Sequence, residues 1–157
     1  MCDLYFLKLK ESLQRLTKEQ LWGEPYTSAN SIGGIDLHIS EHIERCCLRL
    51  TDNESMLKEG FENYFPKENM EVRAVVNHFE NQLNTWKTVI NQYINKEHEL
   101  KIEHIHVLCH VVEHTGYHLG QVIDRVQGTT STNFHFCQNG LNEQYLRMKI
   151  DSNRKNF

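Results

Sequence analysis

The stretch ELKIEHIHVLCHVVEHTGYHLGQVIDRVQ, residues 99–127, predicts the longest helix of the chain. Its apolar side chains recur at spacings of three and four residues, which is the period of one face of an α-helix. Gly128 follows directly, and because glycine commonly ends helices, we expect this helix to stop there. The apolar stripe consists of Leu108, Val111, Val112, Leu119, Val122, Ile123 and Val126.

Histidine is unusually frequent, with ten in 157 residues. Random placement predicts about 0.6 pairs of histidines four residues apart. The chain has four such pairs: His38/His42, His106/His110, His110/His114 and His114/His118. Residues so spaced lie one turn apart on the same helix face, so two imidazoles can bind one metal ion.

A helical wheel separates the histidines of residues 99–127 by their direction. His118 lies beside the apolar stripe and His114 one step further round. His106 and His110 fall near the opposite, solvent-facing side. The pair His114 and His118 is therefore the one expected to border the interior and to bind a metal.

Three further segments have helical periodicity. The first predicted helix spans residues 3–18, with Leu4, Leu7 and Leu16 among its apolar contacts. The second follows an N-cap at Asn30 or Ser31 and ends before Thr51. The third begins after Asn69, and its apolar series is Val72, Val75, Val76, Phe79, Leu83, Trp86, Ile90 and Tyr93.

These segments predict an all-α four-helix bundle with no strand. We expect a single domain over residues 1–157, with a core at 3–127. The tail, residues 129–157, is expected to dock on the bundle through Phe134, Phe136, Leu141 and Tyr145.

A third metal ligand is expected from the second predicted helix. His38 and His42 lie on one flank of its apolar stripe, and either of them can serve. Histidine nitrogens suit zinc, nickel, copper or ferrous iron, and three protein ligands leave a position for water or substrate. If the site is catalytic, we expect a pocket at the ends of the second and fourth helices, lined by apolar and aromatic groups. Tyr117 and Gln121 are candidates to border its opening.

Two other metal motifs are disfavoured. His110-Val-Val-Glu113-His114 matches the H-x-x-E-H pattern of zinc peptidases, but its first histidine faces outward on the wheel. Glu103-x-x-His106 is half of a di-iron pattern whose second half is absent. The adjacent Cys46 and Cys47 point about 100° apart on a helix, so we interpret them as packing residues.

Charge and composition exclude several function classes. The formal net charge of −4 is spread without blocks of one sign, which argues against nucleic-acid and membrane-surface partners. No apolar run approaches the roughly 20 residues of a membrane span, and charges interrupt the N-terminal stretch, unlike a signal peptide. Five cysteines without a Cys-x-x-Cys motif favour a reducing compartment. We therefore expect a cytoplasmic protein.

The chain resembles the DinB-like superfamily of metal-binding four-helix bundles, and its uncharacterised-domain branch in particular. NSIGGIDLHISEH, residues 30–42, resembles the family's opening of the second helix. HVVEHTGYHLGQVI, residues 110–123, resembles its His-x-x-x-His-x-Gly-Gln segment on the fourth helix. The resemblance covers residues 3–127 and is weaker over residues 51–69 and the tail.

The resemblance implies a three-histidine site of His38, His114 and His118 with open coordination positions. It also implies an up-down-down-up helix order, a crossover after the second helix and a homodimer. Zinc or nickel is the expected ion, with iron and manganese as alternatives. Some relatives are thiol-dependent transferases or isomerases, in which a low-molecular-weight thiol attacks a small electrophile. A non-catalytic metal-binding or stress-response role is the alternative, and no residue stands out as a general base.

Overall fold

The computed structural model describes residues 2–51, 63–136, 148 and 151. Five helices lie in this part of the chain: α1 (Cys2–Leu13), α2 (Lys18–Trp22), α3 (Ile32–Leu50), α4 (Val72–Ile94) and α5 (Ile102–Thr130). The same residues contain no strand, so the predicted all-α fold is confirmed. Leu141 and Tyr145 of the predicted docking tail lie outside the described residues.

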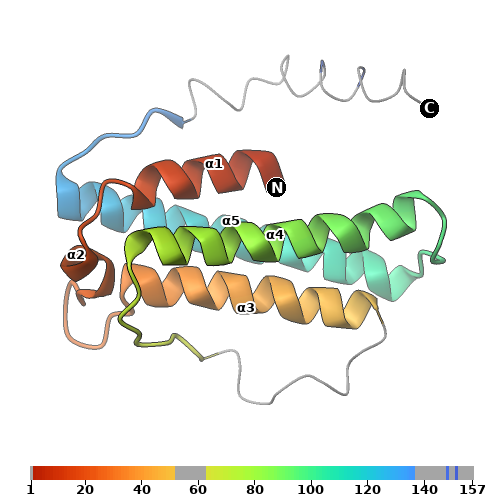
Figure 1. Ribbon diagram of the computed structural model, residues 1–157, viewed down its shortest axis with the longest axis horizontal. Coiled ribbons are helices and arrows are strands. Elements are labelled where there is room, and N and C mark those ends of the chain that lie inside the picture. Colours follow the sequence, from red (N-terminus) through yellow and green to blue (C-terminus); the bar gives the residue numbers. More distant parts are fainter. Residues whose placement is uncertain (1, 52–62, 137–147, 149–150, 152–157) are drawn as a thin grey trace.

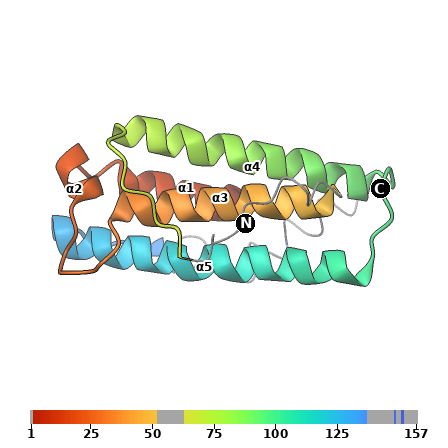
Figure 2. The same ribbon diagram turned by 90° about the horizontal axis from the view of Figure 1, so that it is seen from below.

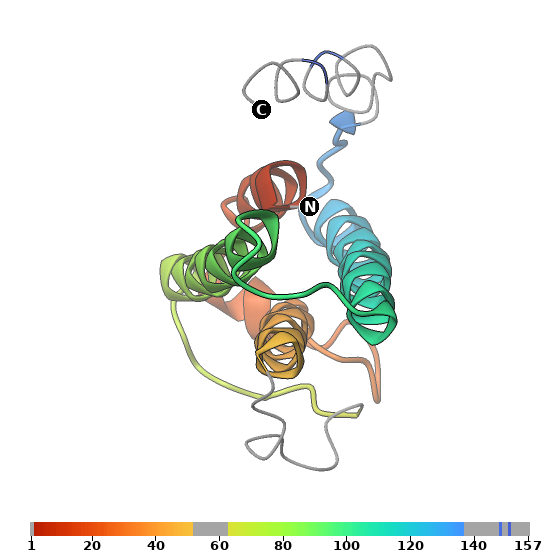
Figure 3. The same ribbon diagram turned by 90° about the vertical axis from the view of Figure 1, so that its right-hand side faces the viewer.

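The long helices lie side by side (Figure 1). Both α1 and α3 contact α4 and α5, whereas α1 and α3 lie at opposite corners when the helices are seen end on (Figure 3). Figure 2 shows α4 and α5 on either side of α3. The sequence colours advance in one direction along α3 and α4 and in the other along α1 and α5 (Figure 1). Neighbouring α3 and α5 are therefore antiparallel.

Apolar faces of all the helices meet in one core. α3 contributes the most, because it is buried along nearly its whole length. Ser31 begins this helix by accepting a hydrogen bond from the Gly34 backbone N–H (3.0 Å), as expected of an N-cap. The largest fully buried apolar side chains are Phe79, Leu9, Leu13, Leu21, Ile35, Ile39, Ile43, Leu50 and Leu83.

The prediction of one helix over residues 3–18 is wrong. α1 ends at Leu13, and α2 begins after Thr17 with a reciprocal cap. The Thr17 hydroxyl accepts from the Gln20 N–H, and the Gln20 side chain accepts from the Thr17 N–H. This cap turns the chain so that α2 packs on α3. Leu7, expected in the core, is 60% exposed.

The end of α5 also differs from the prediction. The helix runs through Gly128 to Thr130 and ends at Ser131, whose φ of 53° is left-handed. Val112, assigned to the apolar stripe, is exposed. Phe134 of the tail packs against the core. No helix in the described ranges is both long and apolar enough to cross a membrane.

Candidate metal centre

The antiparallel helices α3 and α5 bring His38, His114 and His118 together. One ring nitrogen of each lies within 4.8 Å of those of the other two. The Nε2 atoms of His38 and His114 are 3.2 Å apart, and the rings of His114 and His118 meet edge to face at 4.5 Å between centroids. These three residues, called the histidine cluster below, are those that the family resemblance implies.

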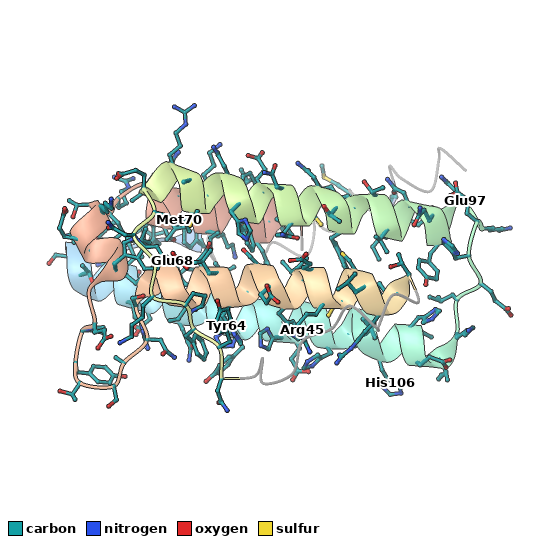
Figure 4. All side chains as sticks on the ribbon, turned by 60° about the horizontal axis from the view of Figure 1, so that its bottom comes forward. Arg45, Tyr64, Glu68, Met70, Glu97 and His106 are labelled. Atoms are coloured by element: carbon teal, nitrogen blue, oxygen red, sulfur yellow. The ribbon has the colours of Figure 1, made fainter. Side chains whose placement is uncertain are left out.

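His38 is held by the segment that precedes α4. Its Nδ1 lies 3.0 Å from the backbone oxygen of Tyr64, and its ring stacks on Phe65 at 4.2 Å between centroids. Because a carbonyl oxygen only accepts hydrogen bonds, Nδ1 carries the proton and Nε2 of the neutral ring carries a lone pair. That lone pair lies on the side of the ring that faces His114. Figure 4 shows Tyr64 and Arg45 along the line where α3 and α5 meet.

Two glycines of α3 allow neighbouring segments to come this close. A Cβ atom on Gly34 would lie 2.9 Å from the Pro66 carbonyl oxygen. A Cβ on Gly33 would lie 2.8 Å from the Trp22 indole, whose N–H donates to the Met70 carbonyl oxygen (2.8 Å). The pair Gly33-Gly34 therefore lets α2 and the segment at residues 64–66 pack directly on the start of α3.

His118 is oriented by its own helix. Its Nδ1 donates to the Gln121 side-chain oxygen (2.8 Å), and the Gln121 amide donates to the Tyr117 hydroxyl (3.1 Å). As with His38, this bond leaves Nε2 of the neutral ring with a lone pair. Hydrogen bonds of this kind, made by the far ring nitrogen, orient histidine ligands in metal sites.

His42 lies beside the histidine cluster, but its nitrogens do not join the three that converge. Its ring stacks on that of His114 at 3.8 Å between centroids, and its Nε2 lies 3.8 Å from the Cys46 sulfur. Of the two candidates on α3, the structure thus places His38 beside His114 and His118. His106, His110 and Glu113 are exposed, as the helical wheel predicts for the two histidines. His110 nevertheless lies closer to the cluster than the wheel predicts, because its ring meets that of His42 at 4.9 Å between centroids and it lines the same cavity.

Burial keeps these histidines neutral at physiological pH. It lowers the pKa of His42 to about 3 and that of His114 to about 4, and it lowers the pKa of His38 and His118 as well. Neutral imidazole is the form that binds a metal. The Nδ1 atom of His114 is buried without a hydrogen-bond partner in the described structure, so this ring is not held at Nδ1 as those of His38 and His118 are. Three neutral imidazoles, two of them oriented from behind, fit a divalent ion.

Asp36 lies on the opposite flank of α3 and takes no part in this cluster. Both of its carboxyl oxygens are buried without a hydrogen-bond partner. Burial therefore raises the pKa of Asp36 well above its ordinary value of 3.8.

A cavity of about 510 Å³ opens beside the histidine cluster. The prediction of an apolar and aromatic lining is wrong, because most of the lining side chains are polar or basic. Tyr117 and Gln121 do border the cavity. The other lining residues are Asn30, His38, His42, Arg45, Arg49, Asn63, Phe65, His110, His114, His118 and Arg125.

Sequence patterns contain a signal for part of this lining that histidine spacing alone does not reveal. Arg45 and Arg49 continue the flank of His38 and His42 along α3, at steps of three and four residues. Gln121 and Arg125 continue the flank of His114 and His118 along α5 in the same way. Nothing in the sequence indicates that the Tyr64 carbonyl contacts His38.

No protein-family model, curated protein or solved structure matches the chain.

Proposed function

We propose that the chain binds one divalent metal ion through Nε2 of His38, His114 and His118. The observation that carries this proposal is the convergence of three neutral imidazoles from two helices. Two of them are also held with Nε2 facing the cluster by hydrogen bonds at Nδ1. Zinc or nickel is the expected ion, and iron or manganese is also compatible with this ligand set.

We further propose that the fold is a DinB-like bundle. The helix directions support the up-down-down-up order, since α1 and α5 run one way and α3 and α4 the other. The described end of the link between α3 and α4 runs back along α3, since Tyr64 lies at His38 and Pro66 lies at Gly34, and this supports a crossover. A homodimer is part of this proposal.

The reaction proposed for the site is attack by a small cellular thiol on a small electrophile. A divalent ion in this site would lower the pKa of a thiol and so supply thiolate at neutral pH. In a conjugation, the sulfur forms a bond to an electrophilic carbon, the leaving group departs with its electron pair, and the thiol proton goes to solvent. The histidines act only as ligands, and the Tyr64 carbonyl and Gln121 orient His38 and His118, respectively. The cavity beside them offers room for both reactants.

The test loads zinc or nickel into wild type and into His38→Ala, His114→Ala and His118→Ala. Metal content is measured by mass spectrometry, and turnover with a panel of thiols and a bimane-type electrophile. We expect about one ion per wild-type chain and a loss of both metal and turnover in each variant, because two imidazoles bind an ion far more weakly than three.

His106→Ala is the matched control, because His106 lies on the same helix but is exposed. Its metal content and turnover should equal those of wild type. Unchanged metal content in His114→Ala and His118→Ala would show that the metal site is wrong. A fully loaded protein without turnover for any thiol would favour the non-catalytic binding or stress-response role.

A further inference from the structure

The cavity beside the histidine cluster has a basic lining. Arg45, Arg49 and Arg125, three of the seven arginines in the chain, line it together with five histidines. No aspartate or glutamate lines it among the residues that the structure describes. The net charge of the chain is −4, yet the charged side chains that line this cavity in the described part of the chain are all cationic.

The arginines lie on both sides of the histidine cluster. Arg45 follows His38 by seven residues on α3, and Arg125 follows His118 by seven residues on α5. Seven residues of α-helix correspond to about 10 Å. Because α3 and α5 are antiparallel, these two steps lead in opposite directions from the cluster.

At least two of these guanidinium groups are set for an external ligand. No ion pair joins Arg49 or Arg125 to a carboxylate within the described ranges. Arg125 donates to the Asn30 backbone oxygen, which holds its side chain at one end of the cavity. Arg49 lines the same cavity as His42, on the same helix. A guanidinium matches carboxylate and phosphate groups because its N–H donors form a planar fork.

We infer that this cavity binds a small elongated molecule with oxyanion groups, carboxylate or phosphate, on both sides of the atom that meets the histidine cluster. This inference rests on the proposed function, and it narrows the thiol or electrophile to an anionic one. Arg49 binds the oxyanion at one end, and Arg125 binds that at the other. The imidazoles meet the middle of the molecule.

The probe is S-methylglutathione, which carries carboxylates on both sides of its sulfur and has no thiol. Its diethyl ester is the matched ligand without the negative charges. Calorimetric titration compares the two on wild type, Arg49→Gln and Arg125→Gln. We expect the diacid to bind wild type at least about tenfold more tightly than the ester, because hydrogen bonds to charged groups are strong. Each arginine variant should reduce this preference.

Arg73→Gln is the control, since Arg73 is exposed on α4 and does not line the cavity. Arg125→Gln could also disturb the fold, because it removes the contact with Asn30. Arg125→Lys, which retains the positive charge, controls for this effect and should keep more of the preference for the diacid than Arg125→Gln does. Inorganic phosphate is added as a competitor to tell the two kinds of oxyanion apart. Strong displacement of the diacid by phosphate would identify the natural ligand as phosphate-bearing. Equal binding of diacid and ester to wild type would overturn the inference.

Metal content measured on the same samples separates this inference from the proposed function. Arginine-dependent binding of the diacid to a protein that takes up no metal would support the oxyanion site and refute the metal site. A metal-loaded protein that does not prefer the diacid would refute the oxyanion site alone.

Discussion

The Tyr64 carbonyl and the Gln121 side chain each hold one imidazole of the histidine cluster from behind. Gln121 is one turn from His118 on the same helix, so a helical wheel can identify it. Tyr64 contributes a backbone atom from the link before α4, and its side chain gives no hint of this contact. Side-chain type and spacing thus predicted His114 and His118, but they left His38 and His42 as alternatives, and only the family resemblance implied His38. The contact that holds His38 at the Tyr64 carbonyl could not be predicted.

Buried thiols differ sharply from exposed ones in this protein. Burial raises the pKa of Cys46 to about 11 and that of Cys47 to about 12, whereas Cys109 is exposed. Because the thiolate is the reactive form, iodoacetamide at pH 8 should alkylate Cys109 and leave Cys46 and Cys47 unmodified. Peptide mass spectrometry gives the extent at each site. In denaturant all three should react, and equal rates in the native protein would contradict the burial of the pair.

At the scale of elements, the hydrophobic periodicity of the sequence predicted where the long helices lie. Val72 to Tyr93 fall within α4, and Ser31 caps α3 as predicted. One error lies where local hydrogen bonds override the period, since the cap at Thr17 breaks the first predicted helix. The other lies at Gly128, through which α5 continues to its left-handed end at Ser131. A single sequence does not show which of two helix-ending residues will be used.

Gly34 in α3 and Gly128 in α5 have different surroundings, so replacing each of them by alanine should have different effects. At Gly34 an added methyl group would meet the Pro66 backbone, so Gly34→Ala should move residues 64–66 away from His38. We expect a loss of about 1–3 kcal/mol in the free energy of unfolding, as for other overpacked positions. Metal affinity should fall too, because the bond between His38 and the Tyr64 carbonyl is lost. Chemical denaturation and metal titration measure the two effects.

Gly128→Ala is the control for that experiment. No atom lies within 4 Å of its added Cβ, and the residue sits inside an exposed part of α5. Replacing glycine by alanine within a helix should therefore stabilise the protein by up to about 1 kcal/mol, without an effect on metal affinity. If Gly34→Ala behaved in the same way, the close approach of residues 64–66 to α3 would not be what orients His38.

On the scale of the whole molecule, the histidine cluster joins parts of the chain that are far apart in sequence. His38 comes from α3, and His114 and His118 come from α5, 76 residues or more away. Residues 64 and 65 hold His38 from the link before α4. Imidazoles so arranged can bind one ion only when these segments are packed as in the folded state. Metal binding should therefore be coupled to the stability of the whole fold.

This coupling predicts a metal-dependent melting temperature. An ion that binds only the folded state adds about 2.7 kcal/mol at a free concentration of one hundred times its Kd. For a domain of this size that corresponds to an increase of about 5–10 °C in Tm. Zinc should raise the Tm of metal-free wild type by this amount, as measured by calorimetry or circular dichroism, and a chelator should reverse it. His106→Ala should show the same increase. His118→Ala should show little, since only two ligands remain, and an equal increase in that variant would mean that the stabilising ion binds elsewhere.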